Sequence, residues 1–157
     1  MSEDTKGARN ETSVEGGCMC GRVRYAVSIT DNDGYLCHCR MCQRAGGGLA
    51  IAFKNVPKDS VTWTTPEPDY YKSSPIARRG HCADCGTPLT FDYPDSEHID
   101  LTIGSFDDPI RFTPTHHFGA ENIHEAWLDT RALPRKRTDE YEPLVKRWKD
   151  TIGKLPE

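Results

Sequence analysis

A chain of 157 residues is long enough for one modest hydrophobic core, and its 36% hydrophobic content is low for a globular protein. Its 13 glycines and 11 prolines indicate many turns, and such a loop-rich fold needs disulfides or structural metals as a further source of stability. The formal net charge of -4 disfavours general binding to nucleic acid, and no segment has the roughly 18 apolar residues of a membrane-spanning helix.

The N-terminal residues 1–13 are polar and charged and show no periodicity, so we expect a disordered tail there. They contain no apolar core of the kind that a secretory signal has. We therefore expect a reducing, cytoplasmic location, where thiols persist and disulfides are rare. The remaining residues, 14–157, contain no linker and no repeat and are expected to form a single domain.

Short β-strands are the main prediction for the part of the chain that follows. In chain order they are predicted at 22–27, 49–53, 61–64, 69–71, 76–81, 88–93 and 98–103. The first of them alternates polar and apolar residues, as a half-buried strand does. The third and fourth are predicted to pair as a β-hairpin around Pro66 and Pro68.

Two helices are predicted. One is a short turn just after Cys42. The other runs from about 140 to 152, where Pro143 is tolerated in the first turn and Gly153 ends the helix. One apolar face of this second helix carries Tyr141, Leu144, Val145, Trp148 and Ile152. The fold class predicted is mainly β, with a C-terminal helix docked on the domain.

The seven cysteines stand in three local motifs: C-M-C at 18–20, C-H-C-R-M-C at 37–42 and C-A-D-C at 82–85. A C-x-x-C turn aims two sulfurs at one ion, and the two cysteines of a C-x-C unit share one face of an extended strand. Three such motifs that use every cysteine predict zinc sites. An iron–sulfur cluster normally takes four cysteines, and a thioredoxin-type motif needs a βαβ setting, so both alternatives are weaker.

Seven ligands divide most naturally into four and three. Cys37, Cys39 and Cys42 lie within six residues of sequence and can close on one ion at little entropic cost. The other four cysteines complete a second site: Cys18, Cys20, Cys82 and Cys85. A closed tetrahedral site is structural, whereas three protein ligands leave one coordination position open. The spacing therefore predicts one structural zinc and one that is available for catalysis.

The open site predicts thiol chemistry. Zinc held by three thiolates prefers a soft fourth ligand, and an incoming thiol is such a ligand. Coordination would lower the pKa of that thiol and hold a thiolate ready to attack an electrophilic carbon, or to leave it when a C–S bond is cleaved. Arg40 and Arg44 flank Cys42 and are candidates for pairing with the carboxylates of an anionic thiol. An equally favoured interpretation is that Arg40 and Arg44 are only surface charges beside the zinc-binding turn.

Histidines near the cysteines are weaker candidates. His38 and His81 each stand beside a cysteine, but local hydrogen bonds are the favoured interpretation because the cysteines already suffice as ligands. His116, His117 and His124 are candidates for lining a pocket, although an ordinary surface or packing role is favoured for each.

The cysteine motifs and their flanking residues resemble a known family. The segments G-G-C-M-C-G-R-V-R-Y at 16–25, C-H-C-R-M-C-Q-R at 37–44 and H-C-A-D-C-G-T-P-L at 81–89 resemble the glutathione-dependent formaldehyde-activating enzyme (centromere protein V-like) family in order and separation. The resemblance runs from about Gly16 to Pro134. It implies an Mss4-like fold, a β-tent of short antiparallel strands, and carbon–sulfur lyase activity that forms S-(hydroxymethyl)glutathione from formaldehyde and glutathione. Carried over, it implies a structural zinc on Cys18, Cys20, Cys82 and Cys85 and a labile zinc on Cys37, Cys39 and Cys42.

Two classes of function therefore compete. The first is a zinc-dependent carbon–sulfur lyase that acts on a thiol–aldehyde adduct, with glutathione or another small thiol as co-substrate and a small electrophile as the other partner. The second is a non-enzymatic zinc module that binds a protein partner, or a sensor of thiols or metals. No pattern in the sequence specifies an oligomeric state.

Overall fold

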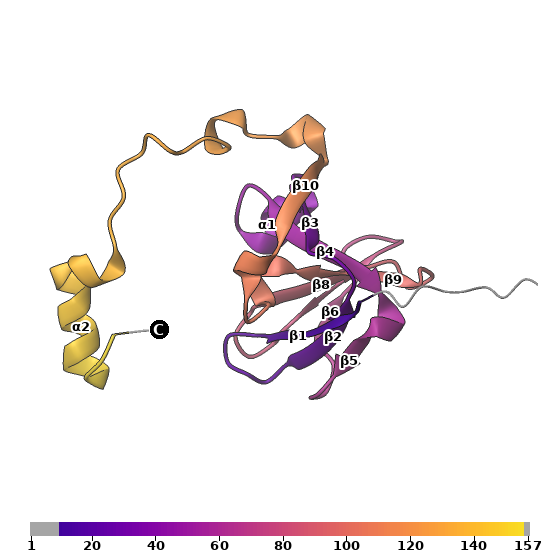
Figure 1. Ribbon diagram of the computed structural model, residues 1–157, viewed down its shortest axis with the longest axis horizontal. Helices are drawn as coiled ribbons and strands as arrows, with labels where there is room; N and C mark the ends of the chain where they lie inside the picture. Colours follow the sequence, from indigo (N-terminus) through magenta and orange to yellow (C-terminus); the bar gives the residue numbers. More distant parts are fainter. Residues whose placement is uncertain (1–9, 156–157) are drawn as a thin grey trace, which may run out of the picture. The chain divides into compact units, whose positions relative to one another are not determined.

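The structure is a computed structural model and describes residues 10–155. Within these residues the fold is mainly β, as predicted, with ten strands in two sheets and two α-helices (Figure 1). The chain divides into two units, one up to Ile123 and one from His124 onward. Each is described by itself, and the single domain expected over 14–157 stays a prediction. The expected tail over 1–13 lies mostly outside the described residues, but strand β1 already begins at Thr12.

The smaller sheet is antiparallel and has the order β1-β2-β5, with bounds Thr12–Gly17, Arg24–Ile29 and Val61–Trp63. Strand β2 confirms the strand predicted at 22–27, displaced by two residues, and its Tyr25, Val27 and Ile29 are buried. Strand β1 was not predicted because its sequence, T-S-V-E-G-G, is mostly polar or glycine. Gly16 is needed there, since a Cβ would lie 2.4 Å from the Tyr25 hydroxyl.

The predicted hairpin is wrong, although both of its segments are strands. Strand β5 pairs with β2 in the smaller sheet, whereas β6 (Asp69–Tyr71) pairs with β7 (Arg78–His81) in the larger one. Trp63 on β5 packs edge-on against the buried Tyr25 ring at 5.7 Å, which holds β5 to the smaller sheet. Pro66 and Pro68, which donate no backbone hydrogen bond, lie where the chain crosses between the sheets.

The larger sheet has the order β10-β3-β4-β9-β8-β7-β6. Its remaining strands are β3 (Asp33–Cys37), β4 (Ile51–Pro57), β8 (Pro88–Asp92), β9 (His98–Thr102) and β10 (Thr113–Phe118). All of its pairs are antiparallel except that β10 runs parallel to β3, a departure from the expected antiparallel tent. Strands β3 and β10 were not predicted, because their polar, glycine and proline content hides the β pattern.

Residues from both sheets form the main core, among them Tyr25 and Val27 from the smaller sheet and Leu89 and Leu101 from the larger. A second, smaller cluster of buried residues gathers around Phe53 and the cysteines at 37–42. Successive residues of a strand point to opposite faces of the sheet, which explains why the two clusters are separate. On β9, Ile99 and Leu101 belong to the main core, so Asp100 between them faces the other way. A cavity opens beside the second cluster.

Helix α1 (Arg40–Gly46) contains Cys42, whereas the sequence placed a helical turn just after it. Helix α2 (Glu142–Ile152) confirms the predicted C-terminal helix, with Pro143 in its first turn and Gly153 as a left-handed cap. Its docking on the domain stays a prediction. The described residues also contain 3₁₀ helices at Lys58–Ser60, Ile103–Ser105, Pro109–Arg111, Ala120–Asn122, Glu125–Trp127 and Thr138–Glu140. Over residues 10–155, neither helix combines the length and apolar character needed to span a membrane.

Candidate metal centres and an adjoining cavity

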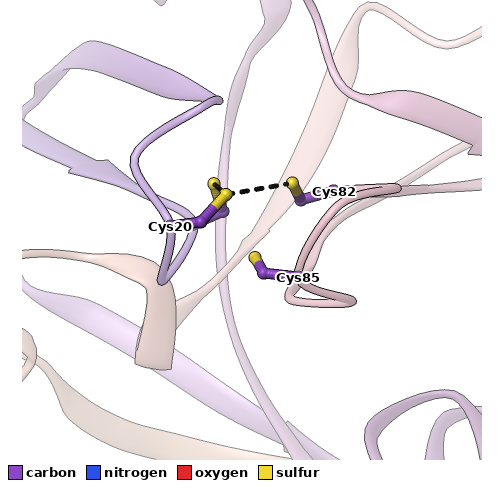
Figure 2. Close-up of side chains that lie close together, drawn as sticks. Cys20, Cys82 and Cys85 are labelled. Atoms are coloured by element: carbon purple, nitrogen blue, oxygen red, sulfur yellow. Dashed lines mark hydrogen bonds between the residues drawn. The ribbon is translucent and has the colours of Figure 1, made fainter.

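Four of the seven thiols meet between two loops of the first unit. Cys18 and Cys20 lie in the loop between β1 and β2, and Cys82 and Cys85 lie in the loop between β7 and β8. Their sulfur atoms all lie within 4.8 Å of one another. Figure 2 shows Cys20, Cys82 and Cys85 pointing toward one another from these loops. We call these four residues the four-thiol cluster.

The spacing of the four-thiol cluster suits a zinc ion. The Cys20 sulfur lies 3.6 Å from the Cys18 sulfur and 3.7 Å from the Cys82 sulfur. A disulfide requires about 2.05 Å, and all seven thiols are free. Four sulfurs arranged tetrahedrally about 2.3 Å from a zinc ion lie about 3.8 Å from one another. The donor set and its spacing therefore fit a closed four-thiolate site.

Hydrogen-bond donors near the four-thiol cluster stabilise negative charge on it. The backbone N–H of Val23 donates to the Cys18 sulfur at 3.2 Å. The Thr87 hydroxyl lies 3.2 Å from the Cys85 sulfur, and hydrogen bonds from the Thr87 side chain and backbone lower the pKa of Cys85 to about 5. Because the thiolate is the form of cysteine that binds metals, these contacts favour a bound cation.

The other three thiols lie where β3 ends and α1 begins. Cys37 is the last residue of β3, Cys39 is the N-cap of α1, and Cys42 lies in the first turn of that helix. The Cys39 sulfur accepts a hydrogen bond from the backbone N–H of Cys42 at 3.3 Å. The three sulfurs lie within 4.8 Å of one another, so the thiols gather in the groups of four and three that the spacing predicts. We call these three residues the three-thiol cluster.

Within the three-thiol cluster, the pKa values of Cys37 and Cys42 shift in opposite directions. A hydrogen bond with Cys42 lowers the pKa of Cys37, and the same bond, together with burial, raises the pKa of Cys42. The Arg79 guanidinium donates to the Cys42 sulfur at 3.4 Å and brings a positive charge to the cluster. A divalent cation would make thiolates of all three cysteines.

Two contacts hold the three-thiol cluster against the chain that follows β10. The buried Gln43 amide donates 3.2 Å hydrogen bonds to the carbonyl oxygens of Leu49 and Asn122. Gly119 has a φ of 65°, and a Cβ on it would lie 2.7 Å from the Cys39 backbone nitrogen. Glycine suits both the left-handed backbone and the close approach. The loop after β10 therefore helps to fix where Cys39 lies.

A cavity of about 350 Å³ opens onto the three-thiol cluster. All three of its cysteines line this cavity, and none of the four-thiol cluster does. Most of the remaining wall is aromatic, from Tyr35, Phe53, Phe91, Tyr93, His116 and Phe118. The three-thiol cluster is therefore accessible to a small molecule, as an open metal site requires, while the four-thiol cluster offers a full set of four ligands.

Two charged side chains also reach this cavity, and the sequence analysis singled out neither. Arg79 on β7 and Asp100 on β9 both pair in register with Phe91 on β8, so the three share one face of the sheet. The Arg79 guanidinium carbon lies 4.9 Å from the centre of the Phe91 ring, and its Nε has no hydrogen-bond partner among the described residues. Asp100 accepts a 3.0 Å hydrogen bond from the Asn55 amide, and burial raises the pKa of Asp100. No local sequence motif marks Arg79 or Asp100, and only the register of β7, β8 and β9 shows that they share a face.

Comparison with known families decides where the chain belongs. The family described as "Glutathione-dependent formaldehyde-activating enzyme" matches residues 13–122, a range that includes all seven cysteines. The chain belongs to this family. The match ends just before Ile123, the last residue of the first unit, so both thiol clusters and the cavity lie within the matched range.

Individual relatives agree with membership of the formaldehyde-activating family. An uncharacterized lyase of Schizosaccharomyces pombe is 33% identical over 79 residues, which are 50% of this chain and 57% of that protein. The chain thus matches little more than half the length of this relative. A crystal structure of a Rhodobacter sphaeroides protein matches with a TM-score of 0.52 and 17% identity, over 64% of this chain and 97% of that protein. At this identity the likeness shows the fold alone.

In this member of the formaldehyde-activating family, Arg40 and Arg44 are exposed and do not line the cavity. The Arg40 guanidinium hydrogen-bonds instead to the side-chain oxygen of Gln43. The cation at the three-thiol cluster is Arg79. His116, for which an ordinary surface or packing role was favoured, belongs to the cavity wall and stacks on Tyr35 with ring centres 5.1 Å apart.

The histidine beside the three-thiol cluster forms a local hydrogen bond, as the sequence analysis favoured. The His38 Nε2 lies 2.8 Å from the His117 Nδ1, and its ring is buried. The backbone N–H of His38 also donates to the Phe118 carbonyl oxygen at 2.8 Å. These two bonds join β10 to the segment between β3 and α1.

Proposed function

We propose that the first unit binds two zinc ions and that the three-thiol cluster is the centre of a carbon–sulfur lyase acting on a thiol–aldehyde adduct. The observation that carries the proposal is the cavity, which opens onto Cys37, Cys39 and Cys42 and onto none of the other four cysteines. A closed thiolate site and an open one in the same unit are what a structural zinc and a catalytic zinc require. Membership of the formaldehyde-activating family supports the same assignment.

The two candidate sites have different roles in this proposal. Cys18, Cys20, Cys82 and Cys85 hold a structural zinc that joins the β1–β2 loop to the β7–β8 loop. Cys37, Cys39 and Cys42 hold the second. Bound there, zinc would supply an open coordination position for the sulfur of a substrate thiol and would lower the pKa of that thiol. Glutathione, the thiol in the name of the family, or another small thiol is the proposed co-substrate.

Residues of the chain orient and protect the reacting groups. The Arg79 guanidinium already donates to the Cys42 sulfur, and because Arg79 lines the cavity its positive charge can pair with an anionic group of the substrate. This makes Arg79, rather than Arg40 or Arg44, the better placed partner for a substrate carboxylate. The aromatic wall excludes water from the adduct, which strengthens the contacts of Arg79.

The reaction itself needs no oxidant or reductant. In the forward direction the thiolate sulfur attacks the aldehyde carbon, an S–C bond forms, and the carbonyl electron pair moves to oxygen, which takes up a proton to become a hydroxyl. In the reverse direction the hydroxyl loses its proton, the carbonyl forms again and the S–C bond breaks. The chain contributes mainly proximity and orientation.

Adduct formation from glutathione and formaldehyde, followed with and without the zinc-loaded protein, tests the proposal. We expect acceleration by the parent protein and a loss of at least about 100-fold in kcat for Cys39→Ser. Serine is a good N-cap, so α1 is retained in this variant. Arg44→Ser, which changes an exposed residue of the same helix that does not line the cavity, is the matched control.

The alternatives predict other outcomes. A binding module or a sensor would accelerate neither this adduct nor those of other small thiols and aldehydes. Activity that survives in Cys39→Ser would place the chemistry away from the three-thiol cluster. Either result would refute the lyase proposal.

A further inference from the structure

The floor of the cavity at the three-thiol cluster is a continuous row of aromatic rings. Tyr35 on β3 and Phe53 on β4 are paired in register, with ring centres 5.7 Å apart. The Phe91 ring on β8 lies 6.4 Å from Phe53 and packs edge-on against Tyr93 at 5.2 Å. Such a surface is apolar and broad, and it offers contacts to the face of a ring rather than hydrogen bonds.

The mouth of the same cavity is apolar as well. Met41 from α1, Tyr93 from the segment after β8 and Phe118 from β10 are 50%, 43% and 62% exposed. A single exposed apolar side chain is ordinary, but three from separate elements converge here on one opening. Apolar side chains that surround an opening in this way indicate that the ligand has an apolar part to cover them.

The charges in the cavity are few. Among the residues that line it, all within the described part of the chain, Arg79 carries a positive charge and Asp100 has a carboxyl group. Arg79 can meet one acidic group, whereas the half-buried Asp100 and the Tyr35 hydroxyl are hydrogen-bonded to each other. Glutathione has two carboxylates, so at least one of them would have no cationic partner if the whole molecule were enclosed. An unpaired charge in an apolar site is costly.

The size of the cavity favours a larger ligand than a one-carbon group. Formaldehyde is little larger than a water molecule, whose share of liquid volume is about 30 Å³. An apolar cavity of about 150 Å³ is enough for a benzene ring, and this one measures about 350 Å³. A one-carbon aldehyde would leave the aromatic floor covered by water or by the charged thiol.

We propose that the adduct handled by this chain carries an apolar, ring-sized group that lies on the aromatic floor, and a single acidic group that pairs with Arg79. Either half of the adduct can supply the ring: an aromatic aldehyde joined to a small thiol, or an aromatic thiol joined to a small aldehyde. The inference deepens the proposed lyase function and rests on it for the identity of the ligand as an adduct.

Binding of two unreactive probes tests the cavity without requiring turnover. Benzoate has a ring and one carboxylate, whereas S-methylglutathione has a one-carbon group and the full charge of glutathione. On the zinc-loaded full chain, calorimetry should show benzoate binding the more tightly. Phe118→Ala should weaken benzoate binding about tenfold, since an apolar contact of this size is worth roughly that factor. Ile110→Ala removes an exposed apolar side chain away from the cavity and should leave binding unchanged.

Turnover then separates the two sources of the ring. The values of kcat/KM are compared for mercaptoacetate with benzaldehyde, for 4-(sulfanylmethyl)benzoate with formaldehyde, and for glutathione with formaldehyde; each of the first two adducts carries one ring and one carboxylate. At least a tenfold advantage for one of the first two pairs is expected, and the preferred pair shows which half carries the ring. Preference for glutathione with formaldehyde, tighter binding of S-methylglutathione than of benzoate, or binding of neither probe would overturn the inference. Benzoate binding without any turnover would count against the lyase, not against a ring-binding cavity.

Discussion

At the scale of single residues, the two thiol clusters differ in whether their members join separate segments of the chain. Cys82 is completely buried, and its sulfur lies 3.7 Å from that of Cys20 across two loops. Cys39 is half-buried and caps a helix within a single segment. Loss of the first should therefore loosen the connection between the sheets, whereas loss of the second should leave the fold standing.

Serine substitutions test this difference in stability. We expect Cys82→Ser to lower the free energy of unfolding by more than about 4 kcal/mol, as losing a structural metal does. Cys39→Ser should change it by less than about 1 kcal/mol, because serine also caps a helix. Denaturant unfolding followed by circular dichroism on zinc-loaded proteins makes the comparison. Equal destabilisation by the two substitutions would contradict the division into a structural and an open site.

Asp100 gives a prediction about pH. Burial raises the pKa of Asp100, so the folded protein binds this proton more tightly than the unfolded chain does. Ionisation of Asp100 therefore destabilises the folded state, and this penalty grows as the pH rises through the folded pKa and disappears below the unfolded value near 3.8. We expect the stability of Asp100→Asn, relative to the parent, to rise as the pH increases from about 4 toward neutrality. Thermal unfolding across this range measures it, and a pH-independent difference would contradict the assignment.

At the scale of elements, the position of the three-thiol cluster depends on the approach of the loop after β10. Gly119 and Gly47 both have left-handed backbones, with φ of 65° and 71°. A Cβ at Gly119 would lie 2.7 Å from the Cys39 nitrogen, whereas a Cβ at Gly47 would have no atom within 4 Å. The two glycines therefore form a matched pair that separates backbone strain from the contact with Cys39.

The variants Gly47→Ala and Gly119→Ala separate backbone strain from the contact with Cys39. Both variants should lose about 1–2 kcal/mol of stability from the left-handed backbone. Only Gly119→Ala should also displace Cys39 and lower the zinc content from two ions to one per chain. Elemental analysis of the purified variants measures the metal. If Gly119→Ala retained both ions, the close approach would have no part in forming the open site.

Much of the fold could be predicted from local pattern, and most of the exceptions involve strands whose partners are distant in sequence. Strands with alternating or apolar sequences, such as β2 and β9, were predicted within two residues of their bounds. Strands β3 and β10 were not, because their β conformation depends on partners that are distant in sequence. The predicted hairpin is wrong because β5 pairs with β2, which is distant in sequence, while β6 pairs with the strand that follows it, β7.

The candidate site shows the same limit. Cysteine spacing predicted both groups of thiols, because the ligands of a metal site carry their own signal in short motifs. Arg79 and Asp100 carry no such signal, since only the register of β7, β8 and β9 brings them to one face. The arginines next to Cys42 in sequence were chosen instead, although helix α1 leaves them exposed.

At the scale of the whole molecule, everything assigned to the metal sites lies in the first unit. The family match ends at residue 122, and the unit ends at Ile123. Removal of residues 124–157 should leave two zinc ions per chain and the activity of the three-thiol cluster. Metal content and adduct formation of the shortened protein test this. Loss of either would favour the single domain that the sequence analysis expects.

If the seven thiols hold two zinc ions of different accessibility, a competing thiol should remove one ion and leave the other, and the zinc stoichiometry should show this. The purified protein is analysed for zinc before and after incubation with millimolar glutathione and a mild chelator. We predict two ions per chain at the start and one after the challenge, and Cys39→Ser should begin with the one ion that resists removal. Two ions that are indifferent to any thiol, or a single ion shared by all seven cysteines, would contradict the account.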